Sequence, residues 1–220
     1  IEVIAEEGLL CVPGVKYEGW QAVIDDWDGS YNGLKGCALS AISVAIDHQG
    51  QPLYGVWYDP YRKFLIYNNN GQVTFLNTEE RVFRGLKTPA GAKTLAEARI
   101  GMARGSRLHQ SQELIEGPIG RLRASVMDDP NYNSSVIFLM SVALGIIDGF
   151  VIAGNKPWDL WATRAIFSKL GIAFFFMEPW TYKVLGPEEI IPDPKKEYAF
   201  ACANNEELFG HIMAKLHGTA

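Results

Sequence analysis

The sequence predicts an α/β (α+β) protein, and three observations lead to that prediction. The first half consists mainly of short apolar runs, rich in β-branched and aromatic residues and separated by turn signals, which is typical of an antiparallel sheet. The second half alternates strand-like apolar runs with helical patterns. Of the 220 residues, 48% are hydrophobic and 20% are charged, so the chain can bury a sizeable core.

The first half is expected to contain five short strands, each ended by acidic or turn-forming residues. They cover residues 1–5, 21–24, 39–47, 53–58 and 63–67. An acidic run ends the second strand, and tight turns are expected after the third strand and after the fifth. The last three strands are therefore expected to form an antiparallel meander.

The second half is expected to alternate strands and helices after a polar, turn-rich join at residues 81–94. Strands are expected at residues 97–102, 148–152, 172–177 and 198–203, and helices at residues 108–115, 134–144, 159–170 and 205–216. Asp159 is expected near the N-cap of its helix, and Gly171 fits the position after a last helical turn. We divide the chain accordingly into residues 1–90 and 91–220.

Composition and charge argue against several classes of function. The formal net charge is −5 and no basic stripe is present, so nucleic acid is not expected as a partner. The most apolar run, residues 136–147, is too short to span a bilayer, so no membrane partner is expected. The three cysteines lie far apart and the four histidines lack zinc spacing. No basic and apolar leader begins the sequence, and the protein is expected to be cytoplasmic.

Acidic residues follow the first two strands and open a later helix. They are Glu6, Glu7, Asp25, Asp26, Asp28 and Asp159. Carboxylates at strand ends and helix starts can converge at one edge of a sheet, where they repel one another unless some are protonated or bind cations. Oxygen ligands favour Mg²⁺, Mn²⁺ or Ca²⁺ over zinc. A carboxylate cluster that holds two such ions is suited to phosphoryl transfer.

The string Asp28-Gly29-Ser30 is a second element of interest. Glycine permits a tight turn and lets a ligand approach its amide, and free amides at such a turn can hold a phosphate. The Ser30 hydroxyl can orient a water molecule held beside a metal ion. The alternative interpretation is a plain surface turn or helix cap, because Asp, Gly and Ser are common turn formers.

Three acidic segments resemble the motifs of the inositol-monophosphatase-like phosphatases. The segment 23–32, VIDDWDGSYN, is similar to the family motif IDPIDGTTN. Residues 4–7, IAEE, precede it as GEE does in the family, and residues 156–162, KPWDLWA, resemble PWDxAA. The order of the three segments is that of the family.

The remaining segments extend the resemblance over nearly the whole chain. Residues 39–45 and 55–60 resemble the family hairpin FAVSIAL…GVVYDP. Residues 145–148 resemble GGAD, and residues 203–205 resemble the AANN that precedes the last helix. The resemblance implies a layered αβαβα sandwich of the inositol monophosphatase and fructose-1,6-bisphosphatase superfamily, with one catalytic site at the junction of the two halves.

The resemblance also implies an activity, a cofactor and an assembly. The expected enzyme is a Mg²⁺-dependent hydrolase that removes phosphate from a small phosphorylated metabolite by metal-activated water. Sugar, inositol, histidinol and nucleotide 3′-phosphates are the candidate substrates. Two or three Mg²⁺ ions per site are expected, Mn²⁺ is an alternative, and the family tends to form homodimers.

Carried over by position, the resemblance implies two metal positions. One ion would be held by Glu6, Asp25 and the backbone carbonyl of Trp27. A second ion would be held by Asp25, Asp28 and Asp159. The family's motifs thus assign a ligand to each acidic segment.

Catalytic and substrate roles follow in the same way. Glu6 and Ser30 would be the catalytic residues, and Gly29 and Ser30 would bind phosphate through their backbone N–H groups. The alcohol or sugar part of the substrate would lie near four residues: Asn133, Ser134, Ser135 and Asp159.

Several positions depart from the family pattern. Asp26 replaces a proline and adds a negative charge beside the metal site, and Asn133 replaces a glycine. Ile152 stands where inositol-specific members carry a glutamate that binds a substrate hydroxyl, and the family's first helices are absent from this sequence. These departures motivate the alternative of a catalytically degenerate relative that binds metal or a phosphorylated ligand, or serves a structural role.

Overall fold

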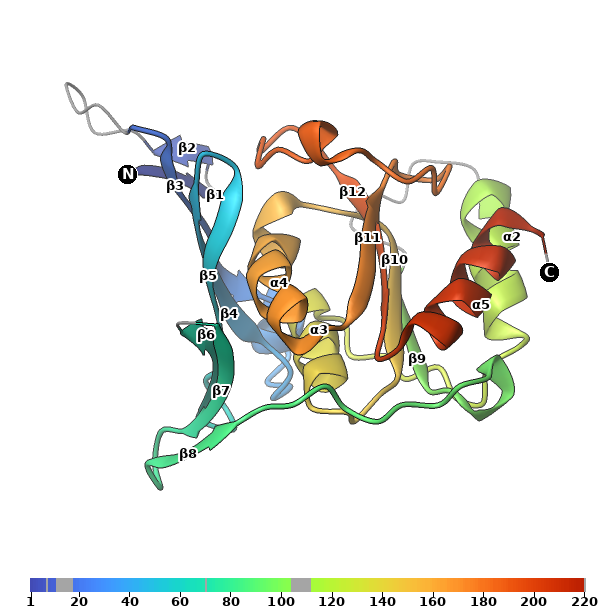
Figure 1. Cartoon of the computed structure of the whole chain (residues 1–220), viewed down its shortest axis with the longest axis horizontal. Coiled ribbons are helices and arrows are strands. Elements are labelled where there is room, and N and C mark those ends of the chain that lie inside the picture. The colour runs from blue at the N-terminus through green and yellow to red at the C-terminus, as the bar shows by residue number, and fades with distance from the viewer. Residues whose placement is uncertain (7, 11–17, 70, 104–111, 220) are drawn as a thin grey trace.

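The computed structural model describes residues 1–6, 8–10, 18–69, 71–103 and 112–219, which form two sheets and the helices packed against them (Figure 1). The larger sheet has eight strands in the order β2-β1-β3-β4-β5-β6-β7-β8. Its strands are β1 (Glu2–Ala5), β2 (Gly8–Leu10), β3 (Trp20–Asp28), β4 (Ala41–His48), β5 (Gln51–Asp59), β6 (Phe64–Asn69), β7 (Gln72–Asn77) and β8 (Val82–Gly85). Only β1 and β3 pair in parallel; all other neighbours in this sheet are antiparallel.

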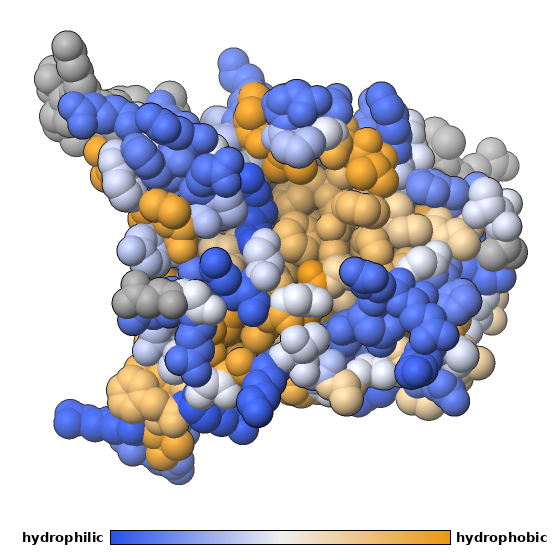
Figure 2. Space-filling view, viewed as in Figure 1, coloured by the Kyte–Doolittle hydropathy of each residue, from blue (hydrophilic) through white to orange (hydrophobic). Residues whose placement is uncertain are grey.

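The smaller sheet has four strands in the order β11-β12-β10-β9. Its strands are β9 (Ile100–Ala103), β10 (Gly149–Asn155), β11 (Ala173–Met177) and β12 (Tyr198–Ala203). The helices are α1 (Ser30–Leu34), α2 (Gln112–Arg123), α3 (Ser135–Ala143), α4 (Pro157–Leu170) and α5 (Glu206–His217), with short 3₁₀ turns at Leu95–Glu97 and Pro187–Glu189. On the face seen in Figure 2, apolar surface gathers in a hollow over β11, one of the two edge strands of this sheet.

The elements form four layers, which Figure 1 shows from left to right as the larger sheet, α3 and α4, the smaller sheet, and α2 with α5. The fold is therefore α+β, as predicted, and its layers are those of the expected αβαβα sandwich without the first helical layer. No helix among the described residues is long and apolar enough to cross a membrane.

Helix α4 connects the two sheets through aromatic contacts. Its Phe167 ring meets Trp57 of β5 edge-on at 5.7 Å between centroids, and its Trp161 ring meets Phe176 of β11 at 5.9 Å. All four side chains belong to one buried cluster. Such aromatic pairs add about 0.5–1.5 kcal/mol each beyond the apolar area that they bury.

A buried polar contact fixes the position of α4 on the larger sheet. Asp47 of β4 is fully buried, and its Oδ2 accepts hydrogen bonds from Trp161 Nε1 at 2.8 Å and from Arg164 at 3.1 Å. The adjacent β5 approaches the helix closely at Gly55, where an added Cβ would lie 2.5 Å from the Ala162 carbonyl oxygen. These contacts position the first turn of α4, which carries Asp159.

The two faces of the larger sheet differ in what they contact. Along β4, residues alternate strictly between buried and half-buried, and the buried set faces α3 and α4. On the opposite face, no described helix covers the strands (Figure 1). That open face carries half-buried apolar side chains, namely Ile42, Val44, Ile46, Val56, Tyr58, Leu65 and Tyr67.

Several predicted element boundaries are wrong. Strand β3 continues through the acidic run to Asp28, because antiparallel pairing with β4 outweighs the low strand propensity of aspartate. The strand expected at 97–102 is a 3₁₀ turn followed by β9. The helix expected from residue 159 begins two residues earlier, because Pro157 takes the first helical position and Lys156 is the N-cap; Asp159 is the third helical residue, near the N-cap as predicted.

Other parts of the prediction are confirmed or incomplete. The meander of β4, β5 and β6 is confirmed, and Gly171 ends α4 in the left-handed conformation. The polar join at 81–94 contains β8, and the short elements β2, β7 and α1 are absent from the prediction. The weak helical pattern at 108–115 lies partly outside the described residues, and α2 extends beyond it to Arg123.

Candidate functional site

Three buried or half-buried aspartates from different elements meet between the larger sheet and α4. Asp25 lies on the helix-facing side of β3 and is 2% exposed, and Asp159 lies in the first turn of α4 and is 9% exposed. The pairing of β3 with β4 shifts register between Asp25 and Asp28. Such an irregularity re-aims a side chain, and here it accompanies Asp28 turning toward the other two carboxyl groups.

The carboxyl groups of these three aspartates are close enough to perturb one another. One oxygen from each lies within 4.8 Å of the others. Three negative charges this close repel one another strongly in a buried site. Binding of protons or of cations relieves that repulsion.

Burial is the main cause of the raised pKa values in this cluster. It raises the pKa of Asp28 to about 7, with a further contribution from the negative charge of Asp25. It raises the pKa of Asp159 well above the usual range, and the charges of Asp28 and Asp25 add to that effect. The pKa of Asp25 is also raised by burial, although hydrogen bonds with Asp159 and with the Trp27 amide oppose the change.

A second acidic group adjoins the first and shares Asp25 with it. One oxygen each from Glu6, Asp25 and Asp26 lie within 4.8 Å of one another. Glu6 follows β1, which pairs in parallel with β3, so the ends of the two neighbouring strands bring these residues together. Glu6 and Asp26 are both exposed, in contrast to Asp25, and Glu7 lies outside the described residues.

The beginning of α3 holds Asp28 in place. Oδ2 of Asp28 accepts hydrogen bonds from Ser134 Oγ at 2.5 Å and from the Val136 amide at 2.7 Å. Ser134 is also the N-cap of α3, because its side chain accepts a hydrogen bond from the Ile137 amide at 3.2 Å. A carboxylate near a helix N-terminus is also favoured by the helix dipole.

The turn after Asp28 requires glycine. Gly29 has φ +81°, and an added Cβ would lie 2.8 Å from the Leu39 carbonyl oxygen and 3.1 Å from Ser134 Cβ. The next residue, Ser30, begins α1, and its hydroxyl donates to the Trp27 carbonyl at 3.0 Å. Gly29, Ser30 and the Trp27 carbonyl are thus held at the same place as the aspartates.

Asn32 joins this turn to the segment before α3. Its buried Nδ2 donates to the carbonyl oxygens of Leu39 at 2.6 Å and Tyr132 at 2.7 Å, and it lies 3.2 Å from that of Asn133. The contacts with residues 132 and 133 span about a hundred positions of sequence. Asn32 belongs to the motif segment 23–32, but the sequence alone gives no sign of this linking role.

The aspartates and the turn after Asp28 line a cavity of about 250 Å³. Seven of the lining residues are predicted site residues: Glu6, Asp25, Trp27, Asp28, Gly29, Ser30 and Asp159. Asn155, Lys156 and Trp158 complete the lining and are absent from the prediction, although they immediately precede or flank Asp159 in the sequence. Lys156 forms an ion pair with Glu197 at 3.3 Å, and both side chains are largely buried.

The other predicted substrate residues do not line this cavity. Ser134 contacts Asp28, and Ser135 Oγ accepts a hydrogen bond from Asn155 at 2.6 Å, so both serines contact residues that do line it. Asn133 has φ +50°, in the left-handed region that asparagine enters more readily than most residues. Ile152 is 2% exposed and lies in the hydrophobic core.

The donor set determines which ion would fit. The described side chains lining the cavity include four carboxylates and neither histidine nor cysteine. Hard oxygen ligands of this kind suit Mg²⁺ or Mn²⁺, and divalent cations would stabilise the ionised forms of the buried aspartates. The residues therefore fit a divalent metal ion.

Comparison with known proteins gives a match over nearly the whole chain. The model of the inositol monophosphatase family matches residues 1–217. The chain is 32% identical over 151 residues to an inositol-1-monophosphatase of Mesorhizobium japonicum, covering 68% of this chain and 54% of that protein. It is 30% identical over 151 residues to the Nus factor SuhB of Salmonella typhimurium, covering 69% and 54%. The matched part thus spans about half the length of these relatives.

Solved structures share the fold. SuhB of Mycobacterium tuberculosis superimposes with a TM-score of 0.77 at 19% identity, covering 99% of this chain and 76% of that chain. A structure described as IMPase/NADP phosphatase complexed with Mg²⁺ and phosphate has a TM-score of 0.71 at 17% identity, covering 97% and 72%. At these identities the likeness concerns the fold.

Proposed function

The chain belongs to the inositol monophosphatase family, and from this premise we propose that it is a Mg²⁺-dependent phosphomonoesterase that acts on a small phosphorylated metabolite. The observation that carries the proposal is the meeting of Asp25, Asp28 and Asp159 from β3 and α4, with carboxyl oxygens within 4.8 Å of one another. Residues 1–90 supply the first two and residues 91–220 the third, which supports one catalytic unit with its site at the junction.

We assign the metal ligands in two overlapping groups. Glu6, Asp25 and the Trp27 carbonyl would hold one ion, and Asp25, Asp28 and Asp159 would hold a second. When bound, such ions would lower the pKa of a water molecule at the site and neutralise the charge of a phosphate. The number of ions, two or three, and the use of Mn²⁺ in place of Mg²⁺ remain predictions, as do the homodimer and the cytoplasmic location.

The chain's own residues would orient the reactants. The backbone amides of Gly29 and Ser30 would bind the phosphate at a turn that admits a close approach because residue 29 has no side chain. The Ser30 hydroxyl and the Glu6 carboxylate would hold the attacking water molecule, and an in-line attack on phosphorus would need no covalent phosphoenzyme. Ser134 would act indirectly. Its hydroxyl donates a hydrogen bond to Oδ2 of Asp28 at 2.5 Å and so fixes the orientation of that carboxyl group.

The substrate's organic part is constrained by one departure from the family. Residue 152 is an isoleucine whose side chain is buried in the core. This position therefore offers no carboxylate to accept a hydrogen bond from a substrate hydroxyl. This disfavours myo-inositol phosphate relative to sugar, histidinol or nucleotide 3′-phosphates. Asn133, Ser134 and Ser135 remain the proposed neighbours of that part of the substrate, together with Asp159.

The test is phosphate release from a panel of phosphate monoesters, with and without Mg²⁺. We expect Mg²⁺-dependent release that is abolished by Asp25→Asn and by Asp159→Asn. Both variants should keep the thermal unfolding curve of a folded protein. Glu80→Gln is the matched control, because Glu80 is exposed in the turn between β7 and β8. Normal turnover in either aspartate variant would contradict the proposal.

The alternative function is that of a catalytically degenerate relative that binds metal or a phosphorylated ligand, or serves a structural role. The burial of Ile152 and the extra charge of Asp26 favour it, and a relative named as a Nus factor keeps a role with other partners open. A folded protein that binds Mg²⁺ but releases no phosphate from any monoester of the panel would support this alternative.

A further inference from the structure

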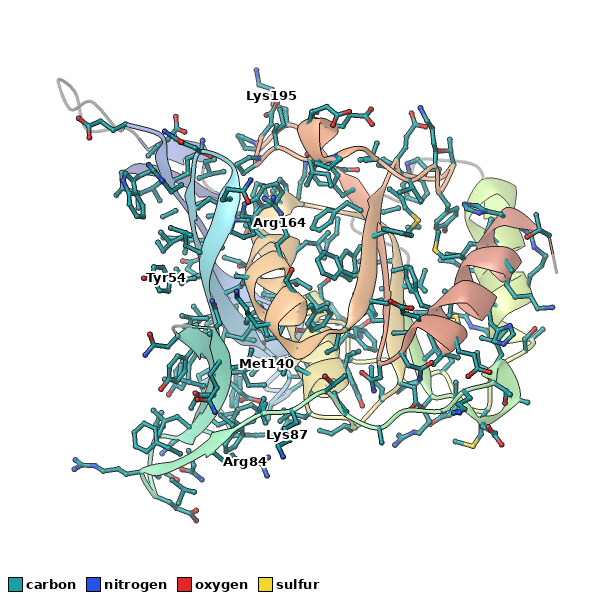
Figure 3. All side chains as sticks on the ribbon, viewed as in Figure 1. Tyr54, Arg84, Lys87, Met140, Arg164 and Lys195 are labelled. Carbon is teal, nitrogen blue, oxygen red and sulfur yellow. The ribbon has the colours of Figure 1, made fainter. Side chains whose placement is uncertain are left out.

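A second cavity, of about 180 Å³, lies between α3 and the neighbouring ends of β5 and β6. None of its lining residues lines the acidic cavity. One face of α3 supplies Ile137, Met140 and Ser141, and the C-cap of the helix supplies Leu144, at the spacing of successive helical turns. Met140, labelled in Figure 3, lies near the centre of the molecule beside the larger sheet.

The walls of this cavity are mainly apolar. Apart from α3, the apolar side chains are Leu39, Phe64, Tyr132 and Ile146. Ser141 is the polar member of the helix face, and its hydroxyl already donates to the Ile137 carbonyl at 2.7 Å. A polyol or a phosphate would therefore lose its hydration here without gaining enough hydrogen-bond partners, whereas an apolar ring would not.

An arginine and an aspartate provide the charged part of the lining. Asp59 is fully buried and accepts hydrogen bonds from the Tyr61 amide at 3.0 Å, the Arg62 amide at 2.8 Å and the Arg62 guanidinium at 2.6 Å. Its charge is thus compensated by three donors. The Arg62 side chain is 51% exposed, and a guanidinium has five N–H groups, of which this contact uses one. Arg62 therefore retains donors for an anion.

The size of the cavity sets the size of the ligand. An apolar cavity of about 150 Å³ is large enough to bind benzene. At about 180 Å³, this cavity has room for one six-membered ring and a small substituent. We propose that it is a binding site for a small aromatic carboxylate, with the ring against the apolar face of α3 and the carboxylate bound by Arg62. The proposal is independent of the function proposed for the acidic site.

Calorimetric titration with benzoate, toluene and benzylamine tests the site in Mg²⁺-saturated protein. We expect benzoate to bind at one site per chain, more tightly than toluene. Benzylamine should bind most weakly, because Arg62 repels its ammonium group and the charge of Asp59 is already compensated by three donors. Absence of saturable benzoate binding would overturn the proposal. Benzylamine binding as tight as benzoate would overturn the role of Arg62.

Two variants locate the ligand. Arg62→Gln should weaken benzoate binding about tenfold more than toluene binding, because loss of the charge-assisted hydrogen bond affects only the carboxylate, whereas loss of a donor to buried Asp59 affects both ligands. Arg84→Gln is the matched control, because Arg84 lies on β8 near the lower edge of the view in Figure 3 and does not line the cavity. Leu144→Trp should abolish binding of both ligands by filling the space, and Leu144 is only partly buried at the end of α3.

A third variant separates this cavity from the acidic site. Benzoate binding should persist in Asp25→Asn. If Asp25→Asn abolishes benzoate binding while Arg62→Gln does not affect it, the ligand occupies the metal site and the proposal fails. If Leu144→Trp does not fold, the Arg62→Gln and Arg84→Gln pair still decides the outcome.

Discussion

The two sheets of this protein are covered differently. Every residue of β10 and β12 in the smaller sheet is buried, because helices lie on both of its faces. In the larger sheet, β4 alternates buried and half-buried residues, because among the described residues only one face carries helices. The covered face of the larger sheet is therefore where burial, raised aspartate pKa values and the candidate site coincide. Among the described residues, its open face has apolar side chains and no comparable acidic cluster.

The strongest test of this difference uses one strand. Trp57 of β5 points to the covered face and is fully buried, whereas Tyr54 lies on the outer side of the sheet, as its label in Figure 3 shows, and is 44% exposed. Trp57→Ala should lower the free energy of unfolding by about 4 kcal/mol. Tyr54→Ala should lower it by at most about 1 kcal/mol. Urea unfolding measures both, and equal losses would show that the open face is covered in solution.

A smaller effect is expected from a matched pair of valines. Val151 of β10 is fully buried between two helical layers, and Val44 of β4 is half-buried on the open face. Val151→Ala should cost about 2–3 kcal/mol in the free energy of unfolding, because it removes buried methyl groups and leaves a cavity. Val44→Ala should cost less than about 1 kcal/mol. A larger loss at Val44 than at Val151 would contradict the comparison.

The buried carboxyl groups make stability depend on pH in the metal-free protein. The pKa of Asp28 is raised to about 7, above its unfolded value, so the folded state binds the proton more tightly. Stability from this group is present at low pH and is lost as pH rises toward 7, by at most about 1.4 kcal/mol per pH unit. Urea unfolding in EDTA between pH 5.5 and 7.5 measures the slope. Asp28→Asn should flatten it, and saturating Mg²⁺ should remove or reverse it.

The smallest effect is expected at the exposed end of the acidic site. Asp26→Asn removes a charge that lies near Glu6 and Asp25 but is exposed to water. Mg²⁺ affinity should fall about threefold at low ionic strength, and the difference should shrink in high salt because exposed charges are screened. Calorimetric titration with Mg²⁺ measures it, and Asp25→Asn serves as the comparison. A loss at Asp26 as large as that at Asp25 would show that both are direct ligands.

Much of the fold could be predicted because local patterns and burial agree. The apolar run at residues 136–147 is long enough for a buried helix, and α3 lies within its first part. The apolar run before Glu178 has the length of a strand, and β11 forms there. The predicted strand ends at Ile24 because three of the next four residues are aspartates. Its extension to Asp28 depends on the partner strand β4, which local propensity does not reveal.

The candidate site was predictable to the extent that it is built from motifs. The convergence of Glu6, Asp25, Asp28 and Asp159 follows from their positions at strand ends and in a helix start. Lys156 lines the cavity because of the path that the chain takes before α4. In the sequence alone, this lysine cannot be told apart from a solvent-exposed one. Ser134 is predicted to lie near the substrate, whereas its hydroxyl contacts Asp28. The sequence does not distinguish these two roles, because the path of the chain before α3 decides which group the hydroxyl meets.

Asn32 gives the site a property that its carboxylates lack. The group that joins the turn after Asp28 to residues 132 and 133 is a primary amide, which donates hydrogen bonds and does not titrate between pH 2 and 12. The seam between the first and second halves of the chain is therefore closed by two kinds of bond. The bonds that Asp28 accepts from Ser134 and from the Val136 amide change in strength with the charge of Asp28. The bonds of Asn32 have a neutral donor and neutral acceptors, which keep their charge whether the aspartates are protonated, ionised or bound to cations.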